Sequence, residues 1–203
     1  METAIPWNVT LFLLINAPAS ASQFALLTAK LFAIYTPWIT IATLLLFWLR
    51  GTSETRRSLM IAGIALVIGL SVNFLITLLV YAPRPFELGI GQTFLAHAPE
   101  TSFPSDHATF LWSLALGLLG SRSLRWLGGV IFSLGLSTAW ARVYLGVHFP
   151  IDMVASFAIA LIAALIANAI SLKMQRILFQ PVERLNGAFL KSLSIFSGRG
   201  GSH

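Results

Sequence analysis

The sequence has no cysteine and little charge, and both absences limit what the protein can be. Without cysteine it cannot form disulfide bonds, use a thiol in catalysis or bind a metal through thiolates. Only 10% of the 203 residues are charged, whereas a soluble domain has about 25%. With 57% apolar residues and a mean hydropathy of +0.83, the composition predicts a membrane protein.

Three long segments contain no charged residue at all. They are 19, 26 and 20 residues long and cover Leu31–Leu49, Ser58–Pro83 and Met153–Leu172. A helix needs about 20 apolar residues to cross about 30 Å of hydrocarbon. The sequence therefore predicts an all-α membrane protein that crosses the bilayer several times.

We expect a helical bundle of about five transmembrane helices plus one short N-terminal helix. The apolar residues 5–16 are too few to span a bilayer and predict an interfacial or re-entrant helix. The five spans are expected at about 24–49, 59–81, 106–120, 126–143 and 150–172. A polar loop over 82–105 separates the second span from the third. Residues 1–203 are expected to form a single integral-membrane domain with its core at about 8–172.

Residues 173–203 are expected to form a basic cytoplasmic tail. Its apolar residues at helical spacing favour an amphipathic helix on the membrane surface, and a disordered tail is the alternative. These residues are Ile177, Leu178, Leu185, Phe189 and Leu193. The final stretch, 198–203, reads as an appended sequence, so His203 is left out of the chemistry.

The basic residues are distributed unevenly between the two ends of the expected spans. Ten of the 13 Lys and Arg residues lie in the 50–57 connection, the 121–125 turn and the tail, which five spans place on one face. By the positive-inside rule this face is cytoplasmic. The same placement in short connections indicates membrane topology rather than a nucleic-acid partner.

The other ionisable groups gather at the opposite, external ends of the spans. Ionisable side chains at or inside a bilayer are costly and usually functional. The alternative is that they only cap helices and extend to the headgroups, which is less plausible for a set that converges from four helix ends. The set contains Lys30, Arg84, His97, His107, Arg142, His148 and Asp152.

These residue types fit phosphate chemistry. Arginine forks match phosphate oxygens, and Ser105 precedes a predicted helix, whose N-terminal N–H groups favour an anion. Two histidines can divide the roles of nucleophile and general acid. Asp152, four residues after His148, can orient its imidazole.

Metal chemistry is the alternative reading of the histidines. Three of them close together could bind zinc, but the arginines beside them match phosphate, and the chain has only two Asp residues. We expect no metal and no cofactor.

At this point the motifs resemble a known family. Arg84-Pro85, Pro104-Ser-x-His107 and Arg142-x5-His148-x3-Asp152 are similar to the motifs of the type 2 phosphatidic-acid phosphatase superfamily of membrane lipid phosphatases. The BcrC-type branch, bacterial undecaprenyl-diphosphate phosphatases, resembles the chain more closely because Asp106 stands where most of the superfamily has Gly. The resemblance covers about residues 8–170.

The resemblance implies conversion of undecaprenyl diphosphate to undecaprenyl phosphate on the external face of the bacterial plasma membrane. This reaction recycles the lipid carrier for peptidoglycan biosynthesis and is linked to bacitracin resistance. It implies that His148 attacks phosphorus to form a phosphohistidine, that Asp152 holds its ring, and that His107 protonates the leaving oxygen and then activates water. The implied substrate-binding residues are Arg84, Ser105, Asp106 and Arg142.

The chain departs from the family where a phosphate-binding lysine is expected. The wider family has this Lys seven residues before the Arg of Arg-Pro, and this chain has Thr77 there. Lys30, the only charge inside the first span, is predicted to replace it. The alternative is that Lys30 extends along the helix to the external headgroups.

Other activities use the same chemistry and remain open from the sequence. They are a phosphatidylglycerol-phosphate phosphatase, another lipid phosphatase, and a phosphotransferase that passes the phosphate to a second lipid. A transporter or lipid-binding membrane protein is the alternative without catalysis. The expected partners are a polyprenyl diphosphate lipid and the bilayer, and the sequence leaves the oligomeric state undetermined.

Overall fold

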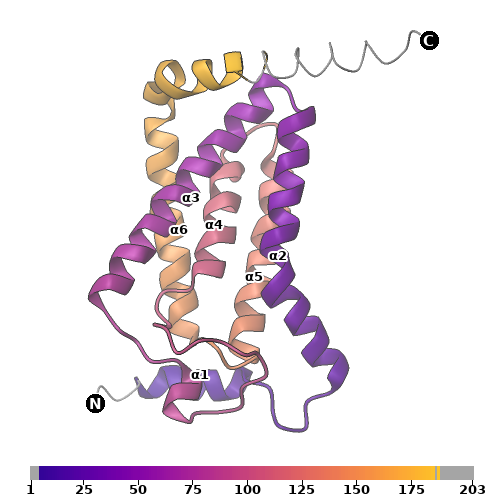
Figure 1. The fold of residues 1–203 in the computed structure, drawn as a ribbon, viewed down its shortest axis with the longest axis vertical. Coiled ribbons are helices and arrows are strands. Elements are labelled where there is room, and N and C mark those ends of the chain that lie inside the picture. The colour runs from indigo at the N-terminus through magenta and orange to yellow at the C-terminus, as the bar shows by residue number, and fades with distance from the viewer. Residues whose placement is uncertain (1–4, 186, 188–203) are drawn as a thin grey trace, which may run out of the picture.

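The computed structural model describes residues 5–185 and 187, and within these residues it contains helices and no strand (Figure 1). The all-helical bundle predicted from composition is confirmed. The helices are α1 Pro6–Ile15, α2 Gln23–Arg50, α3 Ser53–Leu79, the short 3₁₀ helix η1 Pro85–Leu88, α4 Asp106–Leu119, α5 Arg125–Tyr144, α6 Pro150–Met174 and the π-helical turn η2 Gln175–Phe179.

Three helices in the described part of the chain are long and apolar enough to cross a membrane. They are α2, α3 and the stretch Pro150–Ser171 of α6, with mean hydropathies of 1.7, 2.5 and 2.4. The predicted hairpin between α3 and α6 is present as α4 and α5. The second predicted span starts six residues earlier than expected, because the Thr52 side chain accepts a hydrogen bond from the Thr55 N–H and begins α3 at Ser53.

Helix α4 lies at the centre of the bundle. It is the shortest of the helices that run along the long axis of the bundle. It packs against α2, α3, α5 and α6, and nine of its 14 residues are buried. At about 1.5 Å per residue it is about 21 Å long, against about 40 Å for α3. Its N-terminus therefore lies inside the bundle, and the connection over 89–105 runs inward to reach it (Figure 1). This leaves room for a site between the longer helices.

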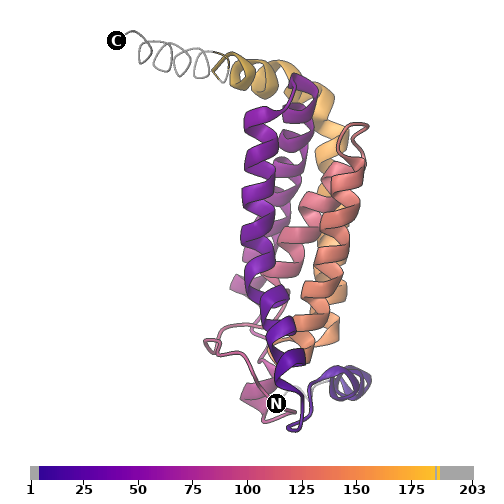
Figure 2. The ribbon, with the colours of Figure 1, turned by 90° about the vertical axis from the view of Figure 1, so that its right-hand side faces the viewer.

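Helix α1 lies across the end of the bundle where this site is found (Figures 1 and 2). It is the short helix predicted over residues 5–16. Asn8 Oδ1 accepts the Ile151 N–H, which ties α1 to the first turn of α6. Asn16 Oδ1 accepts the Gln92 N–H, and its Nδ2 lies 2.8 Å from the Gln92 carbonyl and 3.1 Å from that of Tyr144. Asn16 thus joins the N-terminal segment, the 89–105 connection and the end of α5.

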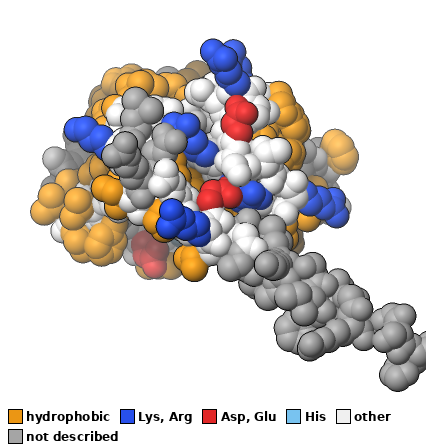
Figure 3. Space-filling model, turned by 90° about the horizontal axis from the view of Figure 1, so that it is seen from above, with side chains coloured by type: hydrophobic (Ala, Val, Ile, Leu, Met, Phe, Trp, Pro, Cys, Tyr) orange, Lys and Arg blue, Asp and Glu red, His pale blue; other side chains and the backbone are white. Residues whose placement is uncertain are grey.

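The opposite end of the bundle is rich in Lys and Arg (Figure 3). The end of α2, the start of α3 and the turn before α5 all carry arginine there. Arg56 Nε forms an ion pair with Glu183 Oε1 at 2.7 Å, which holds the helical residues after η2 against α3. In the tail Phe179 is buried whereas Ile177 and Leu185 are exposed. Some tail residues on which the expected topology and tail helix depend lie outside the described residues. They are Phe189, Lys191, Leu193 and Arg199, and His203 lies outside as well.

Gly146 is required where the turn after α5 meets the 89–105 connection. Its φ is +81°, a backbone conformation that L side chains rarely adopt, and a Cβ there would overlap the carbonyl oxygen of Gln92. Gly89 has a similar φ of +66° but no atom near the place of a Cβ.

We predict that Gly146→Ala destabilises the protein much more than Gly89→Ala. The Gly89 variant should lose about 1–2 kcal/mol from backbone strain alone, and the Gly146 variant should lose that amount plus the cost of moving the two backbones apart. Thermal unfolding in detergent measures the difference. Equal melting temperatures would show that the turn and the connection are not in firm contact.

Candidate active site

A cavity of about 650 Å³ lies between the N-terminus of α4 and the outer ends of its neighbours. Five of the residues predicted from the sequence line it: Arg84, Asp106, His107, Arg142 and His148. Arg84 immediately precedes η1, and the others come from α4, α5 and the turn before α6. The fold thus brings together groups up to 64 positions apart in the chain.

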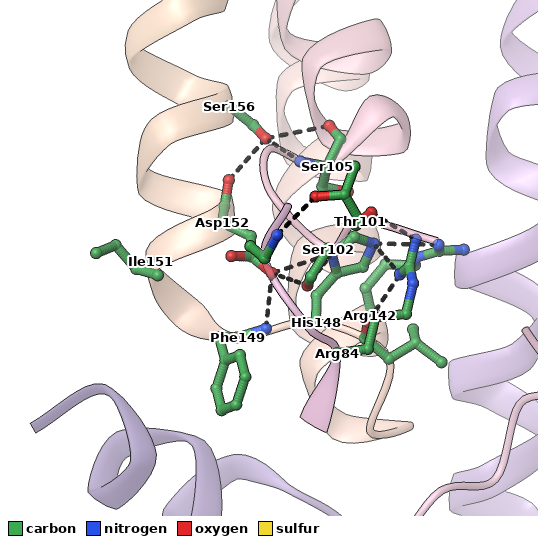
Figure 4. A network of polar contacts seen from close by, with 12 residues as sticks. Arg84, Thr101, Ser102, Ser105, Arg142, His148, Phe149, Ile151, Asp152 and Ser156 are labelled. Atoms are coloured by element: carbon green, nitrogen blue, oxygen red, sulfur yellow. Dashed lines mark hydrogen bonds and ion pairs between the residues drawn. The ribbon is translucent and has the colours of Figure 1, made fainter. Parts of the chain in front are cut away.

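His148 is buried and held through its Nδ1 atom (Figure 4). Nδ1 lies 3.1 Å from Asp152 Oδ2, and the same carboxylate oxygen accepts hydrogen bonds from the Phe149 N–H and the Ser102 hydroxyl. Because a carboxylate only accepts, Nδ1 carries the proton and Nε2 keeps its lone pair. Asp152 therefore has the orienting contact predicted from its spacing.

The free Nε2 atom of His148 faces two guanidinium groups. Arg142 Nη2 lies 3.2 Å away and Arg84 Nη1 lies 3.3 Å away. Burial lowers the pKa of His148 well below its usual value, and the charges of Arg142 and Arg84 and the nearby His97 and His107 lower it further. The resting imidazole is neutral, and a neutral imidazole with an available lone pair is a nucleophile.

Arg84 is mainly an anchor for the backbone around the cavity. Its Nε donates to the carbonyl of Glu100, its Nη1 to that of Val147 and its Nη2 to that of Thr101. These three carbonyls belong to the segment before α4 and the turn before His148. The Arg84 side chain therefore sets the distance between the two segments that carry the site.

Arg142 is only 3% exposed and has donors left without a partner. Its Nη2 contacts His148 and His97, each at 3.2 Å, but its buried Nε has no hydrogen-bond partner. Ser105 Oγ, at the start of α4, is likewise buried and unpartnered, and no side chain caps that helix. Buried donors without acceptors are costly, and an anion at a helix N-terminus satisfies them.

Ser102 and Ser156 belong to this network but were not predicted as site residues, and His97 was placed in the external set without an assigned role. Ser102 holds Asp152 from the segment before α4. Ser156 Oγ accepts the Ser105 N–H and lies 2.7 Å from the Asp152 carbonyl oxygen, so it fixes the start of α4 to α6. Ser156 stands four residues after Asp152 on one helix face and could have been found from that spacing. Nothing in the sequence marks Ser102.

Asp106 and His107 lie between the cavity and a smaller apolar groove. The groove has a volume of about 200 Å³ and is also lined by Pro37, Trp38, Ile41, Leu70 and Phe110 from α2, α3 and α4. Asp106 is held in place by the buried Asn73, whose Nδ2 donates to Asp106 Oδ1 at 2.8 Å. The carboxylate at this position thus has a fixed orientation at the helix N-terminus.

Lys30 is not among the residues that line the cavity, whereas Thr77 is. Within the described residues Lys30 makes no hydrogen bond or ion pair that would fix it, and it is half-buried. It stands 7 and 11 residues before Pro37 and Ile41, so it shares the helix face that lines the groove. Its position is about 10 Å nearer the outer end of α2 than Pro37.

The three histidines of the cavity do not form a metal site. Arg142 Nη2 lies between His97 and His148 and contacts both, so a cation already occupies the space between two of the three rings. Across residues 5–185 and 187 no group of three or more His, Asp or Glu side chains has the arrangement of a metal site.

Residues 58–176 match the model of the PAP2 superfamily. The chain is 36% identical over 178 residues to a protein of Escherichia coli named putative undecaprenyl-diphosphatase YbjG, covering 87% of this chain and 88% of that one. It is 39% identical over 120 residues to undecaprenyl-diphosphatase BcrC of Bacillus subtilis, covering 59% and 61%. An undecaprenyl-diphosphatase of Sulfolobus acidocaldarius is 34% identical over 162 residues, covering 77% and 74%.

Two solved structures share the fold. LpxE of Aquifex aeolicus superposes with a TM-score of 0.66 at 21% identity and covers 83% of this chain and 97% of its own. A PAP2-type phosphatidylglycerolphosphate phosphatase of Bacillus subtilis superposes with a TM-score of 0.54 at 18% identity, covering 84% and 85%. Both support the arrangement of helices around the cavity.

We predict that the two arginines differ in what they stabilise. Arg84→Lys keeps the charge but leaves carbonyls without donors, at about 1–3 kcal/mol each, so its melting temperature should fall. Arg142→Lys should keep its stability but lose about 10- to 100-fold in affinity for orthophosphate, because the Nε donor is gone. Thermal unfolding and ³¹P NMR titration measure the two effects. Equal losses of stability would contradict this division.

Proposed function

The chain belongs to the PAP2 superfamily, and on that premise we propose that it converts undecaprenyl diphosphate to undecaprenyl phosphate and inorganic phosphate. The family resemblance inferred from the three motifs is confirmed. The observation that carries the proposal is the geometry at His148, whose Nδ1 is held by Asp152 while its Nε2 lies 3.2 Å from Arg142 Nη2 and 3.3 Å from Arg84 Nη1 at the wall of the cavity. The names of relatives from E. coli, B. subtilis and S. acidocaldarius support the substrate.

In the first step His148 Nε2 attacks the terminal phosphorus. A P–N bond forms, the P–O bond to the bridging oxygen breaks, and its electron pair goes to that oxygen. His107, which takes up a proton when the anionic substrate enters the cavity, supplies it to the leaving undecaprenyl phosphate. Arg142 and the N-terminus of α4 hold the phosphoryl oxygens as charge develops on them, which is where electrostatic stabilisation has its largest effect. Asp152 stabilises the cationic phosphohistidine through Nδ1.

In the second step water replaces the protein as the phosphoryl acceptor. His107, now neutral, takes a proton from water, and the water oxygen attacks the phosphorus. The P–N bond breaks, its electron pair returns to His148 Nε2, and inorganic phosphate leaves. Neither step needs a metal, because guanidinium groups provide the positive charge.

The groove beside His107 supports a lipid substrate. It is apolar and shares Asp106 and His107 with the phosphate cavity. A prenyl chain lying there would place the bridging oxygen on the side of His107. The residue assigned as the proton donor is thus the one that lies between the two spaces.

We predict that phosphate release is fastest with undecaprenyl diphosphate. In a panel with undecaprenyl monophosphate and phosphatidylglycerol phosphate, kcat/KM should favour the diphosphate by about tenfold or more. His148→Gln should lower kcat by about 10⁴-fold or more, whereas Ser133→Ala, on the exposed side of α5, should not change it. EDTA should leave most of the activity.

Three results would contradict this function. They are a preference for a phospholipid phosphate, phosphate appearing on a second lipid instead of in solution, and a complete loss with EDTA that only added metal restores.

We further propose that the protein lies in the bacterial plasma membrane with the cavity facing outward. The charge distribution supports this orientation, because the basic end lies opposite the cavity. Since the chain has no cysteine, single cysteines report topology directly. Thr93→Cys, at an exposed position in the 89–105 connection, should react with an impermeant thiol reagent on intact cells, and Ser53→Cys should not. Reversed labelling would overturn the orientation.

Lys30 remains a predicted substrate-binding residue, now placed on the groove face of α2 rather than in the cavity wall. Lys30→Met keeps the stem and removes the charge. If the ammonium group contacts the substrate where it passes from the cavity to the groove, kcat/KM should fall by about 10- to 1,000-fold, and Thr77→Lys should partly restore it. Near-wild-type turnover at equal expression would contradict this role and support the alternative, in which Lys30 extends to the lipid headgroups.

A further inference from the structure

His97 is a third histidine in the cavity, and the proposed reaction gives it no role. It lies in the connection between η1 and α4 and lines the cavity together with His107 and His148. Its Nδ1 is 3.1 Å from the Ala98 carbonyl oxygen and its Nε2 is 3.2 Å from Arg142 Nη2. Because a carbonyl only accepts, Nδ1 carries the proton and Nε2 accepts from Arg142. The resting ring is therefore a neutral acceptor.

The position of His97 suits a second phosphate. Its Nε2 and that of His148 each lie 3.2 Å from the same guanidinium nitrogen, Arg142 Nη2, so the two imidazole atoms are no more than twice that distance apart. A terminal phosphate attacked by His148 has its bridging oxygen on the far side of the phosphorus, and the next phosphate follows that oxygen. His97 is thus within reach of a group that only a diphosphate brings.

The other positive groups of the cavity already have partners or roles. Arg84 uses three donors on backbone carbonyls, and Arg142 serves the terminal phosphate. His148 is the nucleophile and His107 faces the leaving oxygen. Lys30 is not among the residues that line the cavity, so a second phosphate inside the cavity needs another cation, because a buried anion without one is costly.

His97 can supply that cation only when the substrate is present. The groups that face it are Arg84, Arg142 and His107, which disfavour its protonated form, and Glu100, which favours it. Burial lowers the pKa of His97, and the two arginines lower it further. The Ala98 carbonyl and Glu100 act in the opposite direction and raise this pKa, but by less. An arriving diphosphate reverses this balance. The protonated ring then donates from Nε2, and Arg142 Nη2 is released toward the terminal phosphate.

We propose that His97 binds the second phosphate of the substrate and makes the site select diphosphates over monophosphates, an inference that rests on the proposed function. His97→Gln tests it, since the amide oxygen reaches the position of Nε2 and can still accept from Arg142, but the side chain cannot become a cation. Farnesyl diphosphate and farnesyl monophosphate, which share one chain, are the substrates. Gln92→Ala, an exposed side chain in the same connection, is the matched control.

We expect His97→Gln to lower kcat/KM for farnesyl diphosphate by about 10- to 100-fold, the effect of losing one charge-assisted hydrogen bond. The value for farnesyl monophosphate should change less than about threefold. Methylenediphosphonate, which cannot be cleaved at its bridge, should lose inhibitory affinity by the same factor as the diphosphate, while orthophosphate should not. This second measurement stands even if the monophosphate is turned over too slowly to measure.

Parallel losses for both substrates and both inhibitors would overturn the proposal, because His97 would then only position Arg142. No loss for any of them would overturn it as well. If the wild-type protein failed to hydrolyse farnesyl and undecaprenyl diphosphates, the proposed function itself would fail. If the wild type hydrolysed them and the variant kept the same selectivity, only the role of His97 would fail.

Discussion

Two buried guanidinium groups without a carboxylate partner are the constraint on which the site depends. Arg84 and Arg142 are 4% and 3% exposed, and the one buried carboxylate beside them, Asp152, is used by His148. Burying charge is costly unless hydrogen bonds offset it. Three backbone carbonyls accept hydrogen bonds from Arg84, and two imidazoles accept from Arg142. These bonds offset the cost of burying each charge. Among the described residues, Arg142 Nε has no hydrogen-bond acceptor.

The rest of the outer end positions these two groups. The short α4 leaves its N-terminus inside the bundle, so the segment before it must run inward past Arg84. Asn16 ties that segment to α1 and α5, and Ser156 ties the start of α4 to α6. Through these contacts the N-terminal segment and α5 hold the 89–105 connection, and α6 holds the start of α4. The cavity is therefore held by contacts from every side, and a loose loop would not keep the arginines at His148 Nε2.

Most of the helices could be predicted because the length of an apolar segment is a local property with a physical threshold. The absence of charge over Leu31–Leu49 and Ser58–Pro83 is sufficient for that. The contact between His148 and Asp152 could also be predicted, since the two residues lie four positions apart, about one helical turn. Lys30 was harder to place, because spacing gives the face of α2 but not which neighbouring space that face lines. Ser102 could not be predicted, since its contact with Asp152 spans 50 positions.

The sequence by itself determined the fold class, the end of the bundle where polar groups gather, and the residue types of the site. These follow from burial energies that act on each residue or on each helical turn. Only the tertiary structure decided that Nε2 of His148 is the free nitrogen, that Arg84 anchors backbone while Arg142 keeps open donors, and that His97 joins the cavity. Those features depend on which donor meets which acceptor, and the partners come from segments far apart in the chain that meet only after the bundle has formed.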